Sequence, residues 1–293
     1  MTEPSEVDVL VPMAGELSEG PCWDDRSQQL FWVDILAGRV HAIDPATGLR
    51  QMWEIETPVG AVVPRSSGGW VAAVERGFAF YDDDWRPMGP VISAPEQPPG
   101  TRFNDGRCDP AGRFWAGTLA YDETPGAGSL YCLEADQVPS RCLTEVTISN
   151  GLGWSADAST MYFVDSGSGT VDTLRFDLAS GTAYDRQTLV AIPPSLGVPD
   201  GLTVDADGFL WVAVWGGGCI RRYSPSGELD RSVVLPVTQV SSMAFGGLHY
   251  AELFITTAAE GLDGRARTEQ PLAGSVFQHH PGVTGRPPTM FAG

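Results

Sequence analysis

The sequence predicts an all-β protein folded as a six-bladed β-propeller. Short runs rich in Val, Phe, Trp and Tyr alternate with turns that contain Gly, Pro and Asp, and helical 3.6-residue periodicity is hard to find. The runs also recur: six copies begin near residues 19, 60, 104, 150, 200 and 241, so successive starts are 41 to 50 residues apart. A period of this length with several strands per copy is typical of a propeller blade.

Each copy joins a short opening segment to a run of large apolar residues. The apolar runs cover residues 30–34, 70–73, 114–117, 161–165, 210–213 and 253–256. The opening segments match best in the copies that begin at residues 19, 150 and 200, which read EGPCWD, NGLGWS and DGLTVD. In two of the copies, the turn signals Asp109-Pro110-Ala111-Gly112 and Asp205-Ala206-Asp207-Gly208 stand between the opening segment and the apolar run.

The six copies account for most of the chain. They leave 18 residues before the first start and about 53 after the last, with no linker rich in Pro, Gly or Ser and no shift in composition. We therefore expect residues 1–293 to form a single six-bladed domain, in which a strand over residues 7–12 closes the last blade.

The charge of the chain excludes several classes of function. The net charge is −19, and all 18 basic residues are Arg, because the sequence contains no Lys. A strongly acidic surface repels phosphate backbones and anionic membranes, so we expect neither nucleic acid nor membrane as a partner. The absence of Lys also excludes Schiff-base chemistry and a phosphate-binding loop that needs its Lys.

The five Cys residues and the N-terminal segment indicate a cytoplasmic protein. The number of Cys is odd and no two are spaced C-x-x-C, which argues against a zinc knuckle and against a disulfide framework. No basic region followed by an apolar stretch opens the chain, and no window approaches 18 uninterrupted apolar residues. We expect free thiols in a reducing compartment.

The first position of the repeat carries the chemistry. Residues at equal phase in successive blades form a ring around the axis of a propeller. The six residues at this phase are Glu19, Gly60, Asn104, Asn150, Asp200 and Ser241. Two carboxylates and two amides offer hard oxygen ligands to Ca²⁺, Mg²⁺, Mn²⁺ or Zn²⁺. Asx residues before Gly also serve turns, but four such residues at one phase favour a metal site.

Other catalytic motifs are absent from the sequence. The four His residues form no H-E-x-x-H, no Ser lies in G-x-S-x-G, and no G-x-G-x-x-G follows a predicted strand. A metal held by carboxylates is therefore the expected electrophile.

The chain resembles the regucalcin/gluconolactonase family, also called the senescence marker protein family, over nearly its whole length. The matching segments are EGP (19–21), RFNDG (102–106), DPAGR (109–113), AGT (116–118), ISNGL (148–152), PDG (199–201), LWVA (210–213), FGG (245–247) and QPLAG (270–274). Each segment is short, but their order along the chain is specific. The resemblance implies six blades and one metal in the central channel.

The resemblance also assigns roles to individual residues. Glu19, Asn150 and Asp200 match the metal ligands of the family, and Asp200 matches its proposed acid/base. Arg102 and Asn104 match a substrate-contacting pair, with Asn104 close to the metal.

One segment departs from the pattern of the family. After Ala-Gly-Thr, where relatives carry a Glu, this chain has Tyr121-Asp122-Glu123, and the spacing gives that place to Asp122. We therefore expect Asp122 to hold sugar hydroxyls, with Tyr121 and Trp215 candidates for the mouth of the channel. A shorter carboxylate there leaves the identity of the sugar open.

The expected activity is the opening of small sugar lactones such as gluconolactone, with one divalent metal, Ca²⁺ or Zn²⁺ first and Mg²⁺ or Mn²⁺ next. The metal acts as a Lewis acid and Asp200 transfers protons. A phosphotriesterase on the same metal, a calcium-binding regulatory protein and a protein-interaction platform remain as alternatives. We expect the protein to be a monomer or a weak homo-oligomer.

Overall fold

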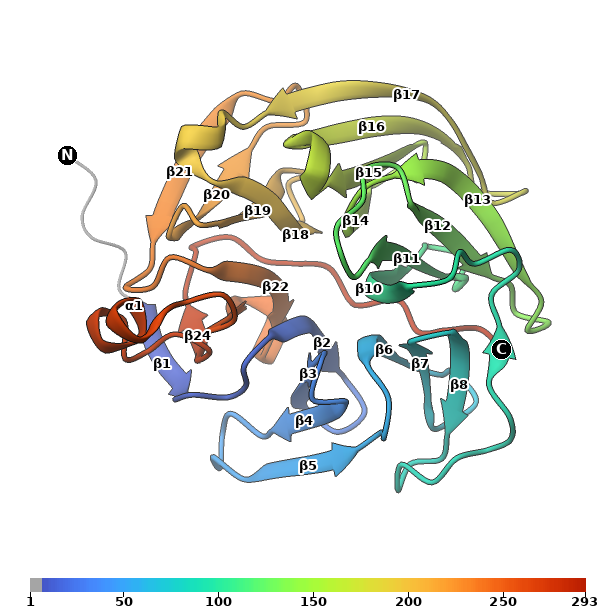
Figure 1. Ribbon diagram of the computed structural model, residues 1–293, viewed down its shortest axis with the longest axis horizontal. Helices are drawn as coiled ribbons and strands as arrows, with labels where there is room; N and C mark the ends of the chain where they lie inside the picture. Colours follow the sequence, from blue (N-terminus) through green and yellow to red (C-terminus); the bar gives the residue numbers. More distant parts are fainter. Residues whose placement is uncertain (1–6) are drawn as a thin grey trace.

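Six four-stranded antiparallel sheets surround a central axis in the computed structural model, which describes residues 7–293 (Figure 1). Blade 1 consists of β2 (Ser18–Asp24), β3 (Gln29–Asp34), β4 (Arg39–Ile43) and β5 (Arg50–Glu54). Blade 2 consists of β6 (Val59–Pro64), β7 (Trp70–Val74), β8 (Gly77–Tyr81) and β9 (Ile92–Ser93). Blade 3 consists of β10 (Thr101–Cys108), β11 (Phe114–Ala120), β12 (Gly128–Leu133) and β13 (Pro139–Val146).

The remaining three blades complete the predicted propeller. Blade 4 consists of β14 (Ser149–Trp154), β15 (Thr160–Asp165), β16 (Thr170–Asp177) and β17 (Thr182–Ala191). Blade 5 consists of β18 (Val198–Val204), β19 (Leu210–Trp215), β20 (Cys219–Tyr223) and β21 (Leu229–Val234). Blade 6 consists of β22 (Val240–Gly246), β23 (Glu252–Thr257), β24 (Val276–His279) and β1 (Val7–Val11). The prediction of an all-β, six-bladed propeller is confirmed.

The outer strand of blade 6 comes from the beginning of the chain. β1 runs antiparallel to β24, with Val7 opposite His279 and Val9 opposite Phe277. This pairing joins the first and the last strand of the described residues in one sheet and so closes the ring of blades.

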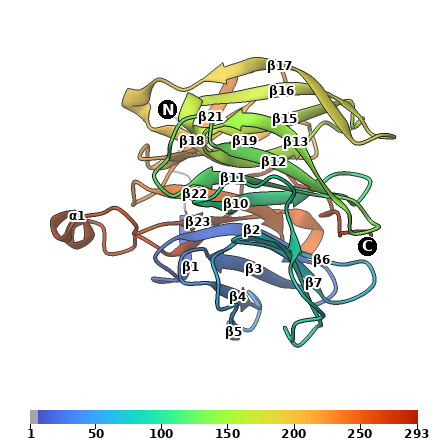
Figure 2. The same ribbon diagram turned by 45° about the vertical axis from the view of Figure 1, so that its right-hand side comes forward.

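Helical structure is limited to short pieces between strands. These are η1 (Ser166–Ser168), η2 (Pro194–Leu196), η3 (Leu248–Tyr250) and α1 (Gly264–Glu269), the last of which stands out from the blades (Figure 2). Within residues 7–293, no helix has the length and apolar character that crossing a membrane requires.

Apolar side chains of the sheets pack against one another between the blades. Trp32, Trp115 and Trp211, on the second strands of blades 1, 3 and 5, are almost completely buried. The predicted turn residues Asp109 and Asp205 accept hydrogen bonds from the indole N–H groups of Trp115 and Trp211, at 3.1 and 3.0 Å. A turn carboxylate thus satisfies the polar atom of a buried core residue.

Every innermost strand is irregular at the ring position. The register shifts between Glu19 and Cys22, Val59 and Ala61, Phe103 and Gly106, Ser149 and Leu152, Pro199 and Leu202, and Val240 and Ser242. A β-bulge leaves a residue out of the ladder and re-aims its side chain. Five of the ring residues lie within these bulges, and Glu19, which still pairs with Val33, directly precedes its bulge.

Candidate metal centre in the central channel

Four polar ring residues are buried at the bulges of four different blades. The exposed fractions of Glu19, Asn104, Asn150 and Asp200 lie between 4% and 8%. They come from β2, β10, β14 and β18, the innermost strands around the axis (Figure 1). Burial of two carboxylates without a salt bridge is costly, so their position needs an explanation other than folding stability.

The other two ring positions serve packing. A Cβ atom on Gly60 would lie 2.5 Å from the carbonyl oxygen of Asn104, so only Gly lets β6 and β10 approach this closely. The Ser241 hydroxyl donates to the Ser18 carbonyl at 2.6 Å and lies 2.9 Å from the Thr256 hydroxyl.

The two ring carboxylates influence each other strongly. The pKa of Glu19 is raised to about 8, mainly by burial and then by the charge of Asp105, while the Gly20 N–H and Arg102 act in the opposite direction. Burial also raises the pKa of Asp200 well above its usual value, and the charges of Glu19 and Asp105 add to the effect. Glu19, Asp105 and Asp200 therefore lie within electrostatic reach of one another, although they come from three blades.

A chain of hydrogen bonds orients the two amides. Asn104 donates through Nδ2 to Asn150 Oδ1 at 3.1 Å and to the Ser149 carbonyl at 3.0 Å. Asn150 donates through Nδ2 to Ser166 Oγ at 2.9 Å, and Ser166 donates to the Pro199 carbonyl at 2.6 Å. Asn150 Oδ1 keeps a lone pair beyond the one that Asn104 uses.

The donor set fits a hard divalent cation. Asp200 Oδ1 is buried and has no hydrogen-bond partner among the described residues, and a carboxylate oxygen in that state is strongly unfavourable unless a cation satisfies it. Within residues 7–293, no three His, Cys, Asp or Glu side chains form a group able to hold a metal. Glu19 and Asp200 would therefore need the Asn150 amide oxygen to complete a ligand set, which is oxygen-only, as Ca²⁺ prefers.

Arg102 is the buried cation next to the ring. It donates through Nη1 to Asn104 Oδ1 at 2.8 Å and to the Phe103 carbonyl at 3.1 Å, and its guanidinium carbon lies 6.0 Å from the centre of the Tyr121 ring. Burial lowers the pKa of Arg102, and the charges of Glu260, Glu19 and Glu123 act against this shift. Arg102 thus orients Asn104 through a hydrogen bond and is itself surrounded by acidic side chains.

Asp122 does not join this buried group. Its side chain is exposed and accepts hydrogen bonds through Oδ1 from the Thr124 N–H at 3.1 Å and the Thr124 hydroxyl at 2.7 Å. These contacts, the hydroxyl first, lower the pKa of Asp122. The charge of the neighbouring Glu123 is among those that act on the pKa of Arg102. A substrate-binding role for Asp122 stays a prediction, and this turn does not support it.

Two residues of the site were not predicted. Asp105 is buried, accepts a hydrogen bond through Oδ1 from the Gly106 N–H at 2.7 Å, and raises the pKa of both Glu19 and Asp200. The signal for Asp105 was available, because it directly follows a ring residue where three other blades have Gly. No sequence signal marked Ser166, because it does not adjoin a ring position and contacts Asn150 from the turn after β15.

These features define a class of protein: a six-bladed propeller with a buried carboxylate and amide site on its axis. Residues 17–259 match the model of the SMP-30/Gluconolactonase/LRE-like region. The chain is 36% identical to regucalcin from Xenopus laevis, over 98% of this chain and 99% of that one, and 36% identical to human regucalcin, again over 98% and 99%. The protein therefore belongs to the SMP-30/gluconolactonase family.

Solved structures agree with this assignment. A luciferin-regenerating enzyme is 30% identical and superposes with a TM-score of 0.90, covering 98% of this chain and 99% of that one. Regucalcin from Agrobacterium tumefaciens, described as a calcium-binding protein, is 28% identical with a TM-score of 0.91, covering 98% of both chains. A gluconolactonase from Xanthomonas campestris shares the fold at 20% identity and a TM-score of 0.75, covering 94% of this chain and 89% of that one.

Proposed function

We propose that this protein is a divalent-metal-dependent lactonase that opens small sugar lactones. One observation carries the proposal: Asp200 presents a buried carboxylate oxygen without a hydrogen-bond partner among the described residues, beside the carboxylate of Glu19. Membership of a family of the lactonase type supports the reaction class. The Arg102–Asn104 pair next to the ring supports a polar, hydroxyl-bearing substrate.

Glu19, Asn150 and Asp200 would hold the metal. Two carboxylates balance a double positive charge, and the amide of Asn150 adds a neutral oxygen. When bound, a divalent cation supplies a Lewis acid that polarises the lactone carbonyl and stabilises the oxyanion. We propose Ca²⁺ or Zn²⁺ first, and the description of the Agrobacterium relative as calcium-binding supports the former.

Asp200 would carry the proton transfers. In its ionised form it takes a proton from the attacking water, and it then delivers a proton to the ring oxygen of the lactone as the C–O bond breaks. Arg102 would donate hydrogen bonds to sugar hydroxyls from its planar fork, and Asn104, fixed by Arg102 and Asn150, would place the substrate beside Asp200.

Substitution of Asp200 tests the proposal most directly. Asp200→Asn keeps the volume of the side chain but cannot accept a proton, so lactone turnover should fall at least about a hundredfold, the typical contribution of a general base. The variant should keep the circular dichroism spectrum of the wild type. Asp136→Asn is the matched control, because Asp136 is exposed and caps the Val138 N–H in a distant turn. Near wild-type turnover of Asp200→Asn would refute the assigned role.

The assay should compare glucono-, galactono-, xylono-, arabinono- and rhamnonolactone with an aryl phosphotriester, after chelation and with each metal restored separately. Activity that survives in verified metal-free protein would refute the metal dependence. Faster hydrolysis of the phosphotriester than of every lactone would identify the site as that of a phosphotriesterase.

A calcium-binding role without catalysis is the second candidate. The names of the relatives favour it, since the Agrobacterium protein is described as a calcium-binding protein and not as an enzyme. Tight Ca²⁺ binding by the wild type, with no lactone hydrolysed under any metal, would support this alternative over the first. The buried Arg102–Asn104 pair argues for a substrate, because cation binding alone has no use for a buried Arg.

A further inference from the structure

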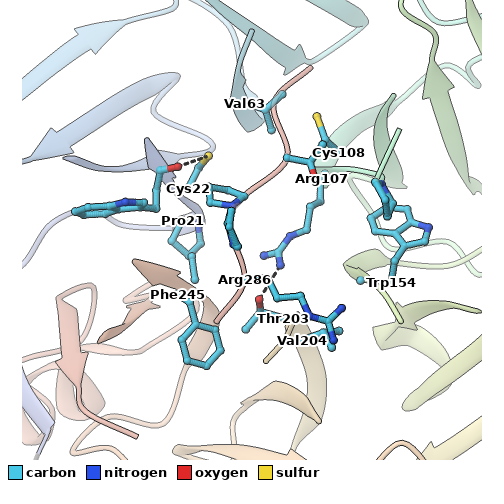
Figure 3. Close-up of a pocket in the computed structure, with 18 of the residues that line it drawn as sticks. Pro21, Cys22, Val63, Arg107, Cys108, Trp154, Thr203, Val204, Phe245 and Arg286 are labelled. Carbon is cyan, nitrogen blue, oxygen red and sulfur yellow. Dashed lines mark hydrogen bonds between the residues drawn. The ribbon is translucent and has the colours of Figure 1, made fainter. Parts of the chain in front are cut away.

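A cavity lies at the centre of the propeller, where the innermost strands continue beyond the ring positions. Its volume is about 280 Å³, and all six innermost strands contribute through residues that follow the ring position. One lining residue from each blade is Pro21, Val63, Cys108, Trp154, Thr203 and Phe245 (Figure 3). The lactonase proposal uses none of these residues.

The C-terminal segment forms one wall of this cavity. Residues 286–289 line it and run between Val63 and Phe245 in Figure 3. The segment is fixed beyond that point, because Phe291 is fully buried and donates its N–H to the Pro64 carbonyl at 2.9 Å. Pro287 and Thr289 line the cavity and are also exposed to solvent, so this segment forms part of its rim.

Two arginine side chains extend into the cavity (Figure 3). Arg107 donates through Nη1 to the Thr203 hydroxyl at 2.8 Å. For the guanidinium of Arg286, the part of the chain that the structure describes offers neither a hydrogen bond nor an ion pair; its electrostatic effect falls on Tyr162. A guanidinium carries five N–H donors, so both Arg residues have donors left for a ligand.

The cavity is positively charged, in contrast to the rest of the protein. Its one carboxylate among the described lining residues is Asp105, which faces Arg107 electrostatically. Burial raises the pKa of Cys22 to about 12 and that of Cys108 well above its usual value, so neither thiol adds negative charge. An excess of positive charge inside a chain of net charge −19 favours an anionic occupant.

The remaining wall is mostly apolar, with Ser155, Thr203 and Thr289 as its hydroxyl-bearing residues. Pro21, Val63, Trp154 and Phe245 surround the two guanidinium groups. Small-molecule sites combine mostly apolar walls with a few polar groups that fix orientation, and this volume lies near the lower end of such sites. A polyhydroxylated sugar acid would leave most of its hydroxyls unpaired against these walls, whereas an apolar body would not.

We propose that this cavity binds a small carboxylate with an apolar body, whose carboxylate pairs with Arg107 and Arg286 and whose body packs against Trp154 and Phe245. Planar guanidinium groups match carboxylates through paired N–H···O bonds. The cavity borders the ring through Asp105 but is lined by none of the proposed metal ligands, and occupation of it does not depend on the proposed lactonase activity.

Titration calorimetry with benzoate tests the proposal on the full chain after chelation, so that no ring metal can take the carboxylate. We expect one benzoate per chain, and Arg286→Gln should weaken its binding about tenfold or more through loss of a charge-assisted contact. Arg50→Gln is the matched control, since it removes the same charge from an exposed position on β5 and should leave binding unchanged. Benzyl alcohol, which has the same shape without the charge, should bind more weakly.

Several outcomes would overturn the proposal: no benzoate binding, equal affinity for benzyl alcohol, equal loss in Arg50→Gln, or tighter binding of inorganic phosphate than of benzoate. Benzoate binding that survives Asp200→Asn would place the site away from the ring and support the proposal. Loss of benzoate binding in Asp200→Asn would instead assign the ligand to the ring. A protein without any lactonase activity would still be expected to bind benzoate.

Discussion

Removal of one buried ring charge should stabilise the metal-free protein. Glu19→Gln keeps the size of the side chain and an oxygen that can accept from the Gly20 N–H, which Glu19 Oε2 now does at 3.0 Å. The pKa of Glu19 rises from 4.5 to about 8 on folding, mainly because of burial. Each pKa unit corresponds to about 1.4 kcal/mol, so ionisation of Glu19 in the folded protein costs on the order of 5 kcal/mol.

The sign of the pH dependence follows from the direction of the shift. Because the folded pKa is the higher one, the folded state holds the proton more tightly, and Glu19 lowers stability progressively as the pH rises from about 4.5 to about 8. In urea unfolding of chelated protein, Glu19→Gln should therefore match the wild type near pH 4.5 and exceed it in unfolding free energy at pH 8. With saturating Ca²⁺ the order should reverse, since only the wild type gains from ligand binding.

Glu228→Gln controls for net charge, because Glu228 is exposed in a turn. It should leave the unfolding free energy unchanged at both pH values. If metal-free Glu19→Gln were no more stable than the wild type at pH 8, burial of ionised Glu19 would not have the free-energy cost that we assign to it. That cost would then no longer support a cation site at the ring.

Three further substitutions test the surroundings of the ring. Arg102→Lys loses the planar guanidinium that donates to Asn104, so the KM for a lactone should rise about tenfold with a smaller change in kcat. A large fall in kcat with little change in KM would contradict a binding role. Asp122→Asn keeps an oxygen that can accept a hydrogen bond from Thr124, so its kcat/KM should stay near that of the wild type. A large loss of kcat/KM would show that Asp122 contacts the substrate after all. Gly60→Ala places a Cβ 2.5 Å from Asn104 O and should cost about 1–3 kcal/mol in urea unfolding, and an unchanged midpoint would refute the close packing.

The repeat made the architecture predictable. The six predicted starts coincide with the bulges of the six innermost strands, and residues 7–12 contain β1. Periodicity works here because each blade repeats the same packing problem, so the same residue types return at the same phase. The phase also led to Glu19, Asn104, Asn150 and Asp200, which the structure buries at those bulges.

Features outside the repeat were not predictable in this way. The turn that holds Asp122 follows local hydrogen bonding to Thr124, and spacing alone does not encode it. The path of residues 286–291 below the channel depends on single contacts, such as that of Phe291 with Pro64, which no periodic signal marks. The positive cavity was hidden too, because an overall charge of −19 says nothing about where individual Arg side chains gather.

The pairing of β1 with β24 makes the order of folding matter. β1 precedes the strands of the other five blades in the described sequence and can pair with β24 only when residues 276–279 exist, so the pairing that closes the ring comes after those blades have been made. Contacts between residues this far apart along the chain form late, because the intervening segment must first be ordered. Until then the outer edge of β24 is an open template for other strands. A newly made chain is therefore most vulnerable to mispairing at this seam.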